Sequence, residues 1–276
     1  MNMEKIKVNY YCQWETNYDN NHPKKWEWVR NQNTPFDAYI DRGMYKAKNN
    51  SKKKIGLIRE PGGMFPDVKE WIVKEENWKL FKYVFTSDPI ILNILPNAKQ
   101  NIIGGVWYVT NIKPLDKNKL ISFCCTKKRM IQSHIDRQKL ADIIKDRVDM
   151  FGGYIGPRAT TKEIYEDYKF NIVFEPEHNE YHFSEKILNC FSNKCIPINY
   201  GCTNLKKWGF DESSIIQISK PEEIVDLLNS DFDFNKFYDD NIDSIEYNYK
   251  NCIQYSFFED WLLDTYTDIF KELYYD

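Results

Sequence analysis

Short apolar segments alternate with amphipathic segments through the second half of the chain, and this alternation constrains the fold more than any other feature. The apolar runs with the length of buried strands are residues 120–125, 148–151, 170–175, 195–199 and 214–218. The segments with helical spacing or helix-start signals are residues 133–144, 161–168, 184–191 and 221–228. A β-α-β-α order predicts a parallel sheet with helices on both faces, so we expect an α/β fold.

The first half of the chain is less regular. Strands are expected at residues 5–12, 54–59 and 82–86, and a segment with helical spacing at residues 68–81. Residues 14–51 are polar, aromatic and irregular, which predicts long loops with short elements. From these patterns we expect a first domain at residues 1–112, a second at residues 113–255 and an aromatic-rich C-terminal helix at residues 256–276 that packs back on the first.

The composition excludes several classes of protein. Of 276 residues, 42% are hydrophobic and 29% are charged, as in globular rather than disordered chains. The net charge of -3 indicates no basic face, so nucleic acid is not an expected partner. The cysteines show no CxxC spacing and read as reduced thiols. The N-terminal residues contain no long apolar run, so we expect no signal peptide, no membrane span and a cytoplasmic enzyme of microbial or viral type.

Residues 168–202 contain the strongest chemical signal. A buried strand places Glu175 at its carboxyl end, a polar loop follows, and a helix opens at Ser184, Glu185 and Lys186. Ligands of open α/β sheets bind beyond the carboxyl ends of the strands, and a helix N-terminus attracts anions. Lys186 stands early in its helix, against the helix dipole, and a bound diphosphate would explain that position. Glu185 would accept hydrogen bonds from ribose hydroxyls; the simpler alternative makes both ordinary surface residues.

This segment resembles the donor-binding motif of the α1,3-fucosyltransferases, glycosyltransferase family 10. The family pattern is YKF-x-x-x-FEN, a loop, Y-x-TEK, an apolar helix, a turn and (V/I)P(V/I)-x-x-G. The matching residues are Tyr168, Lys169, Phe170, Phe174, Glu175, Ser184, Glu185, Lys186, Ile196, Pro197, Ile198 and Gly201. The interval from Phe174 to Glu185 matches the family without a gap. The resemblance covers about half of the chain, mostly in the second domain.

Weaker similarity extends upstream. Residues 122–137 resemble the family's strand-loop-helix segment, in which the arginine matched by Arg137 contacts the donor diphosphate. Lys127, in the same loop, is a further donor-binding candidate. Residues 133–136 have the form of a capping box, which predicts that Arg137 lies in the first turn of a capped helix, where an anion could bind. A plain surface arginine is the alternative.

Residues 59–63 occupy the place of the family's short strand that ends in the general-base glutamate, here Glu60. An inverting transferase needs one carboxylate to take the proton from the attacking hydroxyl. A glutamate at the end of a buried strand, before a Gly-rich turn, is held rigidly. Most glutamates are solvated, and that is the alternative for Glu60.

The resemblance implies a GT-B architecture, in which two Rossmann-like domains face an interdomain cleft. It implies inverting transfer of a sugar, fucose by family default, from a nucleotide-sugar donor in the C-terminal domain to a hydroxyl of a glycan acceptor. No metal and no cofactor are expected, because Arg137, Lys186 and a helix N-terminus would stabilise the leaving diphosphate. Tryptophans that belong either to the acceptor site or to the core are Trp14, Trp26, Trp28 and Trp107.

Two residues of the donor loop depart from the family pattern. Pro176 replaces an Asn, and Pro can neither donate nor accept with its side chain. His182 replaces a Tyr and is itself a donor-binding candidate. A UDP-sugar such as UDP-xylose is therefore an alternative donor to GDP-fucose, and a non-catalytic glycan-binding module is a second alternative. A glycoside hydrolase would need two facing carboxyl groups without an anion site, which Arg137 and Lys186 argue against.

Other patterns imitate functional motifs. His178 and His182 are four residues apart, but Pro176 and the polar run favour a loop, in which this spacing does not aim both imidazoles at one metal ion. Residues 231–233 form a DxD tripeptide, which reads as a solvated turn because it follows the sheet and helix alternation. The glycine pair at residues 104–105 is expected only to mark a turn.

Overall fold

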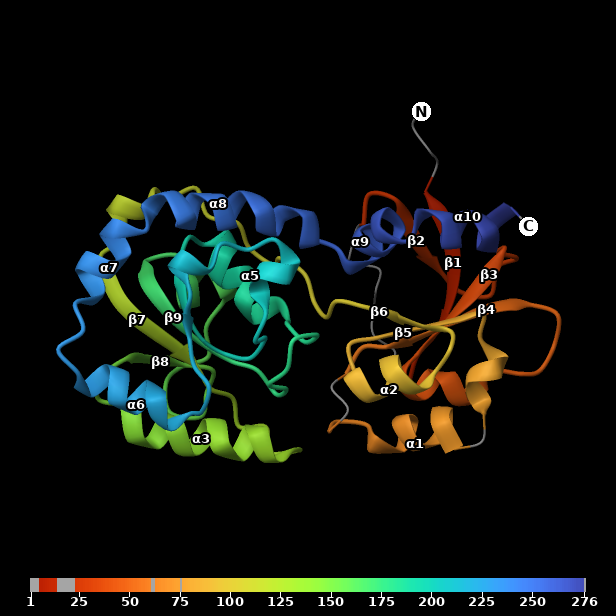
Figure 1. Ribbon diagram of the computed structural model, residues 1–276, viewed down its shortest axis with the longest axis horizontal. Coiled ribbons are helices and arrows are strands. Elements are labelled where there is room, and N and C mark those ends of the chain that lie inside the picture. The colour runs from red at the N-terminus through yellow and green to blue at the C-terminus, as the bar shows by residue number, and fades with distance from the viewer. Residues whose placement is uncertain (1–4, 14–22, 61–62, 75, 276) are drawn as a thin grey trace. The chain divides into compact units, whose positions relative to one another are not determined.

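The computed structural model describes residues 5–13, 23–60, 63–74 and 76–275. The chain divides into two compact units (Figure 1). The first contains Met1–Ile103 and Phe257–Asp276, and the second is Gly104–Ser256. No helix in the described part of the chain is both long enough and apolar enough to cross a membrane.

The boundary between the units lies at residues 103–104 rather than at the expected 112–113. The segment after Ile103 is held by helix α5 (Glu185–Ser192) of the second unit. Asn189 Oδ1 accepts hydrogen bonds from the N–H groups of Trp107 and Tyr108, at 2.8 and 3.3 Å. The Thr110 N–H donates to Ser192 O at 3.1 Å. These bonds depend on a helix far along the chain, so no local pattern could show them.

The first unit contains a parallel six-stranded sheet. Its strands, in spatial order, are β2 (Trp26–Val29), β1 (Ile6–Tyr11), β3 (Phe36–Ile40), β4 (Lys53–Ile58), β5 (Tyr83–Thr86) and β6 (Ala98–Gln100). Residues 14–51 were expected to form long loops with short elements, and β2 and β3 are two such short elements, although the sequence pattern did not place them. All of β3 is buried, and it hides its one charged residue, Asp37, which accepts from Thr34 Oγ1 at 3.0 Å and pairs with Lys52 at 3.7 Å.

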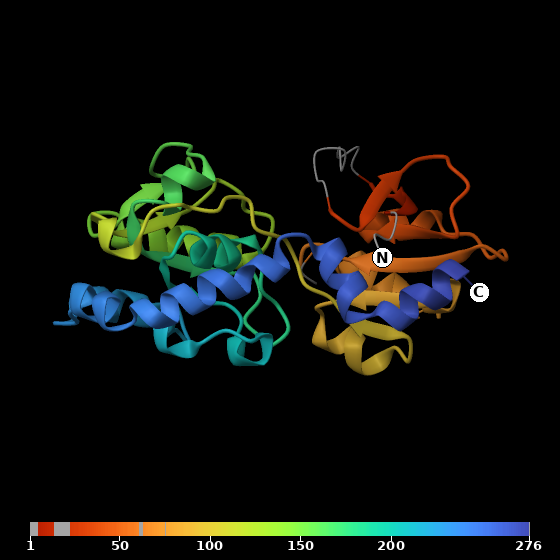
Figure 2. The same cartoon turned by 90° about the horizontal axis from the view of Figure 1, so that it is seen from above.

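Helices cover both faces of this sheet (Figures 1 and 2). One face carries α1 (Pro66–Lys74) and α2 (Pro89–Ile94), and the other carries α9 (Phe258–Thr265) and α10 (Thr267–Tyr275). The segment with helical spacing at residues 68–81 is thus a shorter α1 followed by a 3-10 turn, η3 (Asn77–Leu80). The single C-terminal helix that was expected is broken at Tyr266, where φ is -119° and ψ is 40°.

Trp26 and Trp28 belong to the core of the first unit rather than to its surface, at 1% and 8% exposure. The Trp26 ring lies 5.6 Å from the ring of Phe270 in α10 and 6.0 Å from that of Phe36. Trp28 Nε1 donates to the buried carboxylate of Glu259 at 2.9 Å. Trp14 lies outside the described residues.

The second unit contains a parallel five-stranded sheet, as the alternating pattern predicts. Its strands, in spatial order, are β11 (Ile216–Gln217), β10 (Ile196–Tyr200), β9 (Tyr168–Phe174), β7 (Lys119–Cys124) and β8 (Asp149–Phe151). The helices are α3 (Gln132–Ile144), α4 (Thr161–Tyr165), α5, α6 (Glu222–Asn229), α7 (Phe234–Asp240) and α8 (Ile242–Cys252). In Figure 1, α3 and α6 lie on one side of the sheet and α5 and α8 on the other.

Candidate functional site

The strand order of the second unit fixes where a ligand can bind. β7 is the first strand of its sheet in sequence, and it lies between β8 and β9. The chain therefore leaves β7 toward β8 on one side and later returns to β9 on the other. Such a topological switch point opens a crevice beyond the carboxyl ends of the two strands, where open α/β sheets bind ligands. Thr126 lies two residues beyond the end of β7, and Glu175 directly follows β9.

Glu175 organises the first turn of α5. Its side chain is 1% exposed, and its Oε1 accepts from both the N–H and the hydroxyl of Ser184, at 3.0 and 2.6 Å. Its Oε2 accepts from Lys186 Nζ at 2.9 Å. Burial alone would raise the pKa of Glu175, but Lys186, His182 and the Ser184 hydroxyl together hold it below its ordinary value. Glu175 is therefore a buried carboxylate that fixes Ser184 and Lys186, and its contact with a donor stays a prediction.

Lys186 remains within reach of a ligand, because its side chain is 27% exposed. Burial would lower the pKa of Lys186, but the carboxylates of Glu175 and Glu185 raise it, so the ammonium stays charged. Its Nζ lies 3.6 Å from Glu185 Oε1. From the sequence, a lysine in the first turn of this helix was explained by a bound diphosphate. The ion pair with Glu175 is a second explanation for the same position. The contact of Glu185 and Lys186 with a donor stays a prediction.

The N-terminus of α5 is closely packed. Ser184 is its N-cap, and Ser184 Oγ accepts from the Lys186 N–H at 3.3 Å. Gly104, with φ of +94°, lies directly against this turn, and a Cβ there would be 2.5 Å from the backbone nitrogen of Glu185. Only glycine combines a positive φ with such a close approach. The expectation that residues 104–105 merely mark a turn is therefore wrong.

Arg137 lies at the same edge of the sheet. It is 7% exposed and donates through Nη2 to Thr126 Oγ1 at 3.0 Å. Within the described part of the chain, its Nε is buried without a hydrogen-bond partner and no carboxylate lies within ion-pair distance of it. A buried cation of this kind is costly unless a ligand neutralises it.

The start of α3 differs from the prediction. The helix begins at Gln132 after Ile131, which makes no side-chain capping bond, so the capping box at residues 133–136 is absent. Arg137 accordingly lies beyond the first turn. A capping box does occur at α4, between Thr160 and Glu163. The position of Arg137 thus comes from burial beside β7 and not from a cap.

The local field around Arg137 and Lys186 is positive. Burial, together with the charges of Arg137, Lys128 and Lys186, lowers the pKa of His134 to about 4. Burial raises the pKa of Cys124 at the end of β7, while Arg137 and Lys186 oppose that rise. Both cations therefore act at the carboxyl end of β7. Lys127 lies exposed in the loop that follows β7, and its contact with a donor stays a prediction.

The two histidines of the donor loop have different environments. His182 is 1% exposed, with Nε2 3.9 Å from Glu175 Oε2, and burial lowers its pKa. Its contact with a donor stays a prediction, because this conformation buries the ring. His178 is exposed and stacks on Tyr200, with centroids 4.8 Å apart. Among the residues that the structure describes, no three His, Cys, Asp or Glu side chains cluster as metal ligands. Asp233 of the DxD tripeptide is the N-cap of α7.

In the first unit, Glu60 follows the end of β4 and is exposed. Its backbone is held by Asp41, a residue that the sequence did not single out. Asp41 Oδ1 accepts from the N–H groups of Arg59 and Glu60, at 2.8 and 3.2 Å. Asp41 is 5% exposed and has a φ of 48°, a conformation that Asp and Asn adopt more readily than most residues. The convergence of Glu60 with Arg137, Glu185 and Lys186 stays a prediction.

Asp41 gives the protein a testable dependence on pH. Burial raises its pKa to about 6, against the lowering effect of the Arg59 and Glu60 N–H groups. In the unfolded chain the pKa of Asp41 is about 3.9. The stability that this raised pKa contributes is therefore fully present below about pH 4 and is lost as pH rises through about 6. An Asp41→Asn variant has a neutral amide at this position and therefore lacks this change of stability with pH. We expect the free energy of unfolding of the wild type, minus that of the variant, to fall by about 2 kcal/mol between about pH 4 and pH 6.5. Urea unfolding measures it, and a constant difference would contradict it.

Comparison with solved structures shows which folds are similar. A crystal structure of α1,3-fucosyltransferase with GDP matches with a TM-score of 0.57 and 13% identity, over 98% of this chain and 90% of that one. One with GDP-fucose matches with a TM-score of 0.58 and 13% identity, over 99% and 91%. A complex of a mutant of S. aureus TarM with UDP and other ligands matches with a TM-score of 0.53 and 14% identity, over 85% and 55%.

Comparison of the sequence with family models and with curated proteins gives no match. The structural likenesses extend over nearly the whole chain, and they show an α/β fold of the GT-B type. This confirms the predicted fold class.

Proposed function

We propose that the chain is a glycosyltransferase, which moves a sugar from a nucleotide-sugar donor to a hydroxyl of a glycan acceptor. The observation that carries the proposal is the buried guanidinium of Arg137, which no carboxylate of the described residues neutralises, at the switch point of the second sheet. A nucleoside diphosphate supplies two neighbouring anionic groups. One would bind Arg137, and the other would bind Lys186 and the N-terminus of α5.

The Glu185 carboxylate is suited to recognise the ribose of the nucleotide. It is the first residue of α5, and its side chain is 24% exposed. Its carboxylate accepts hydrogen bonds, and a ribose offers two adjacent hydroxyl donors. Glu175 and Ser184 would act through Lys186 and the helix start, by holding both in place before the donor arrives.

The proposed reaction is a single displacement with inversion. Glu60 takes the proton of the acceptor hydroxyl, whose oxygen attacks the anomeric carbon of the donor sugar. The bond from that carbon to the diphosphate oxygen breaks, and the nucleoside diphosphate leaves with the electron pair. Arg137, Lys186 and the positive end of the α5 dipole would stabilise the charge on the leaving group, the role that a metal ion has in other transferases.

Ligand-dependent unfolding tests this proposal. Melting temperatures are measured with GDP and with UDP, each with and without EDTA, because a ligand of the folded state raises the melting temperature. We expect a shift with at least one nucleotide that EDTA does not remove. GDP alone would favour a GDP-fucose donor, and UDP alone a UDP-sugar such as UDP-xylose.

A shift with neither nucleotide would reject the donor site and favour the alternative of a non-catalytic glycan-binding module. A shift that EDTA abolishes would contradict a metal-independent site. Slow hydrolysis of the bound donor, read as release of nucleoside diphosphate, separates a transferase from a protein that only binds the nucleotide.

A further inference from the structure

Two loops at the carboxyl edge of the second sheet contain cations and no acids. Residues 125–131 (CTKKRMI) join β7 to α3, and residues 152–160 (GGYIGPRAT) join β8 to α4. Neither loop contains an Asp or a Glu, although the chain as a whole has a net charge of -3. The exposed basic residues of the two loops, called the loop cations below, are Lys127, Lys128, Arg129 and Arg158.

The two loops lie side by side. Thr126 and Gly153 form an isolated antiparallel bridge between them. A Cβ at Gly153 would lie 3.3 Å from Arg158 Cγ, so the Arg158 side chain folds over this bridge. Arg129 is close enough to Tyr154 of the other loop for its charge to act on that hydroxyl. The loop cations therefore form one patch of positive charge at the ends of β7 and β8.

Helix α3 fixes the backbone of the 125–131 loop. The buried Gln138 donates through Nε2 to Thr126 O and Lys128 O, at 3.0 and 3.1 Å. One turn earlier in the helix, His134 Nδ1 accepts from the Met130 N–H at 3.3 Å. The loop is thus held in place before a ligand arrives, which reduces the entropy that binding costs.

The patch has no counter-ion of its own. Within the described part of the chain, the side chains of the loop cations form neither an ion pair nor a hydrogen bond. Two acids of the neighbouring α3 have other partners. Asp136 Oδ1 accepts from Gln132 Nε2 at 2.9 Å and from Lys139 Nζ at 3.1 Å, and Asp142 Oδ2 accepts from Tyr154 Oη at 2.9 Å.

The loop cations exceed what the diphosphate of a donor needs. A diphosphate esterified at both ends carries one negative charge on each phosphate, and Arg137 and Lys186 already offer one cation to each. With Lys127 added as a third donor contact, the other three loop cations are still left over. They lie beside the donor site, since Arg137 Nη2 donates to Thr126 Oγ1 in the same loop. A second anionic group of the substrate would account for them.

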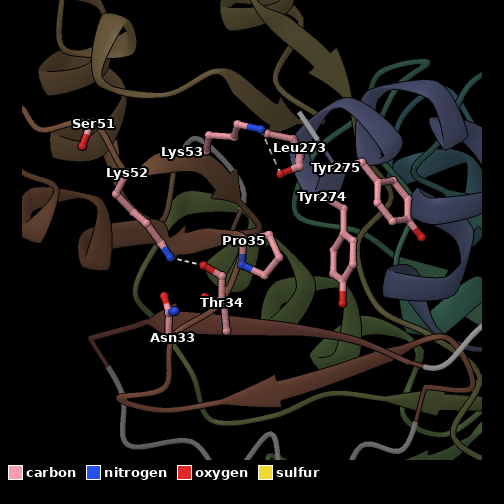
Figure 3. A pocket seen from close by; sticks show the side chains of 9 residues that line it. All are labelled: Asn33, Thr34, Pro35, Ser51, Lys52, Lys53, Leu273, Tyr274 and Tyr275. Atoms are coloured by element: carbon pink, nitrogen blue, oxygen red, sulfur yellow. Dashed lines mark hydrogen bonds between the residues drawn. The ribbon is translucent and has the colours of Figure 1, made fainter.

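A pocket of the first unit is a poorer candidate for such a group. It has a volume of 670 Å³ and lies at the amino ends of β3 and β4, away from the edge where parallel sheets bind ligands (Figure 3). Its lysines are already used: Lys53 Nζ donates to the carbonyls of Glu272 and Leu273, at 2.9 and 3.3 Å, and Lys52 donates to Thr34 O. These bonds join the end of α10 to the sheet.

We propose that the loop cations bind an acid group, a carboxylate or a phosphate, on the acceptor glycan. Because it assigns this group to the acceptor, the inference rests on the proposed function. Lys128, Arg129 and Arg158 contact the acid group, next to the diphosphate of the donor. The acceptor is thus an acidic glycan rather than a neutral one.

Titration of the full chain with matched pairs of oligosaccharides tests this. Trigalacturonate is compared with its methyl ester, and maltotriose phosphate with maltotriose, by NMR on the 15N-labelled protein. The members of each pair differ in charge and share their sugar units. We expect at least one acidic member to bind about tenfold more tightly than its neutral partner, as charge-assisted contacts allow. The two pairs distinguish carboxylate from phosphate recognition.

Three double variants connect this preference to the loop. Lys128→Gln with Arg129→Gln should remove about the tenfold factor, and Lys128→Arg with Arg129→Lys should keep it. Lys145→Gln with Arg147→Gln removes the same two charges at exposed positions just beyond the other end of α3, and should bind like the wild type. Equal binding within both pairs, unchanged binding in the first variant, or an equal loss in the control would each overturn the proposal.

Two further measurements separate other partners of the patch. Met130 and Ile155 of the same loops are 59% and 40% exposed, and exposed apolar groups beside cations also suit an anionic membrane. Binding to phosphatidylserine vesicles without a preference for acidic oligosaccharides would overturn the proposal. GDP and UDP are titrated into the same samples, and the first double variant should bind the nucleotide much as the wild type does. Loss of nucleotide and acid binding together would assign the patch to the donor and overturn the proposal.

The same titrations separate this inference from the proposed function. If the wild type binds a nucleotide and shows no preference for acidic oligosaccharides, the acceptor inference fails and the proposed function stands. If the acidic oligosaccharides bind as expected and neither nucleotide binds, the patch is an acid-binding site and the transferase is rejected.

Discussion

An Arg137→Met variant is expected to lose nucleoside diphosphate binding while its melting temperature stays the same or rises. Arg137 is buried and has no carboxylate partner among the described residues, so its charge costs stability in the free protein. The Met side chain is unbranched like that of Arg, but it cannot donate the hydrogen bond to Thr126. With the cation gone, the diphosphate loses a buried charged contact, which is worth about 3 kcal/mol or about 100-fold in Kd.

Calorimetric titration with GDP and UDP, together with thermal unfolding, measures both effects. Arg147→Met is the control, because Arg147 lies exposed just beyond the other end of α3 and donates to Leu228 O at 2.9 Å. This control should bind nucleotide normally. A variant Arg137→Met that binds nucleotide like the wild type, or that unfolds far more easily, would show that Arg137 is a structural residue.

The fold of the second unit could be predicted because its strands are locally apolar. Residues 170–175 were expected as a strand, and β9 covers Tyr168–Phe174. In the first unit, β3 escaped prediction because it contains Asp37, which looks incompatible with a central buried strand. The carboxylate is tolerated there because Thr34 and Lys52 satisfy it from outside the strand. A local pattern cannot show partners that only the fold brings together.

The local structure of the candidate site was predicted from the sequence, but the contacts among its residues were not. The spacing from Glu175 to Lys186 indicates a strand end followed by a helix start, which the structure confirms. The spacing does not show that the Glu175 carboxylate is buried and forms an ion pair with Lys186. Gly104 and Asp41 were missed, since each acts on a segment distant in sequence, at Glu185 and at Glu60. A single glycine or aspartate in one sequence carries no signal of such a contact.

Glu175→Gln is expected to be the most destabilising single change at the site. The substitution leaves the Lys186 ammonium facing an amide, with Glu185 at 3.6 Å as its remaining ion pair among the described residues. Breaking a buried pair by removing one partner costs about 3–5 kcal/mol. Nucleotide binding should weaken as well, because Ser184 and Lys186 lose the group that orients them. Urea unfolding measures the first effect and calorimetric titration the second.

A double-mutant cycle with Lys186→Met shows whether the loss comes from the ion pair itself. Lys186→Met alone leaves the Glu175 carboxylate buried with Ser184 and His182, so it too should destabilise the fold. The double variant leaves neither partner of this pair as an unpaired buried charge, so it should lose less than the sum of the single variants, by about 2 kcal/mol or more. Lys250→Met, at an exposed position of α8, should change stability little. Additive losses of stability would mean that Glu175 stabilises α5 through Ser184 alone. Nucleotide binding should be lost in the double variant as in Lys186→Met, because both lack the Lys186 ammonium.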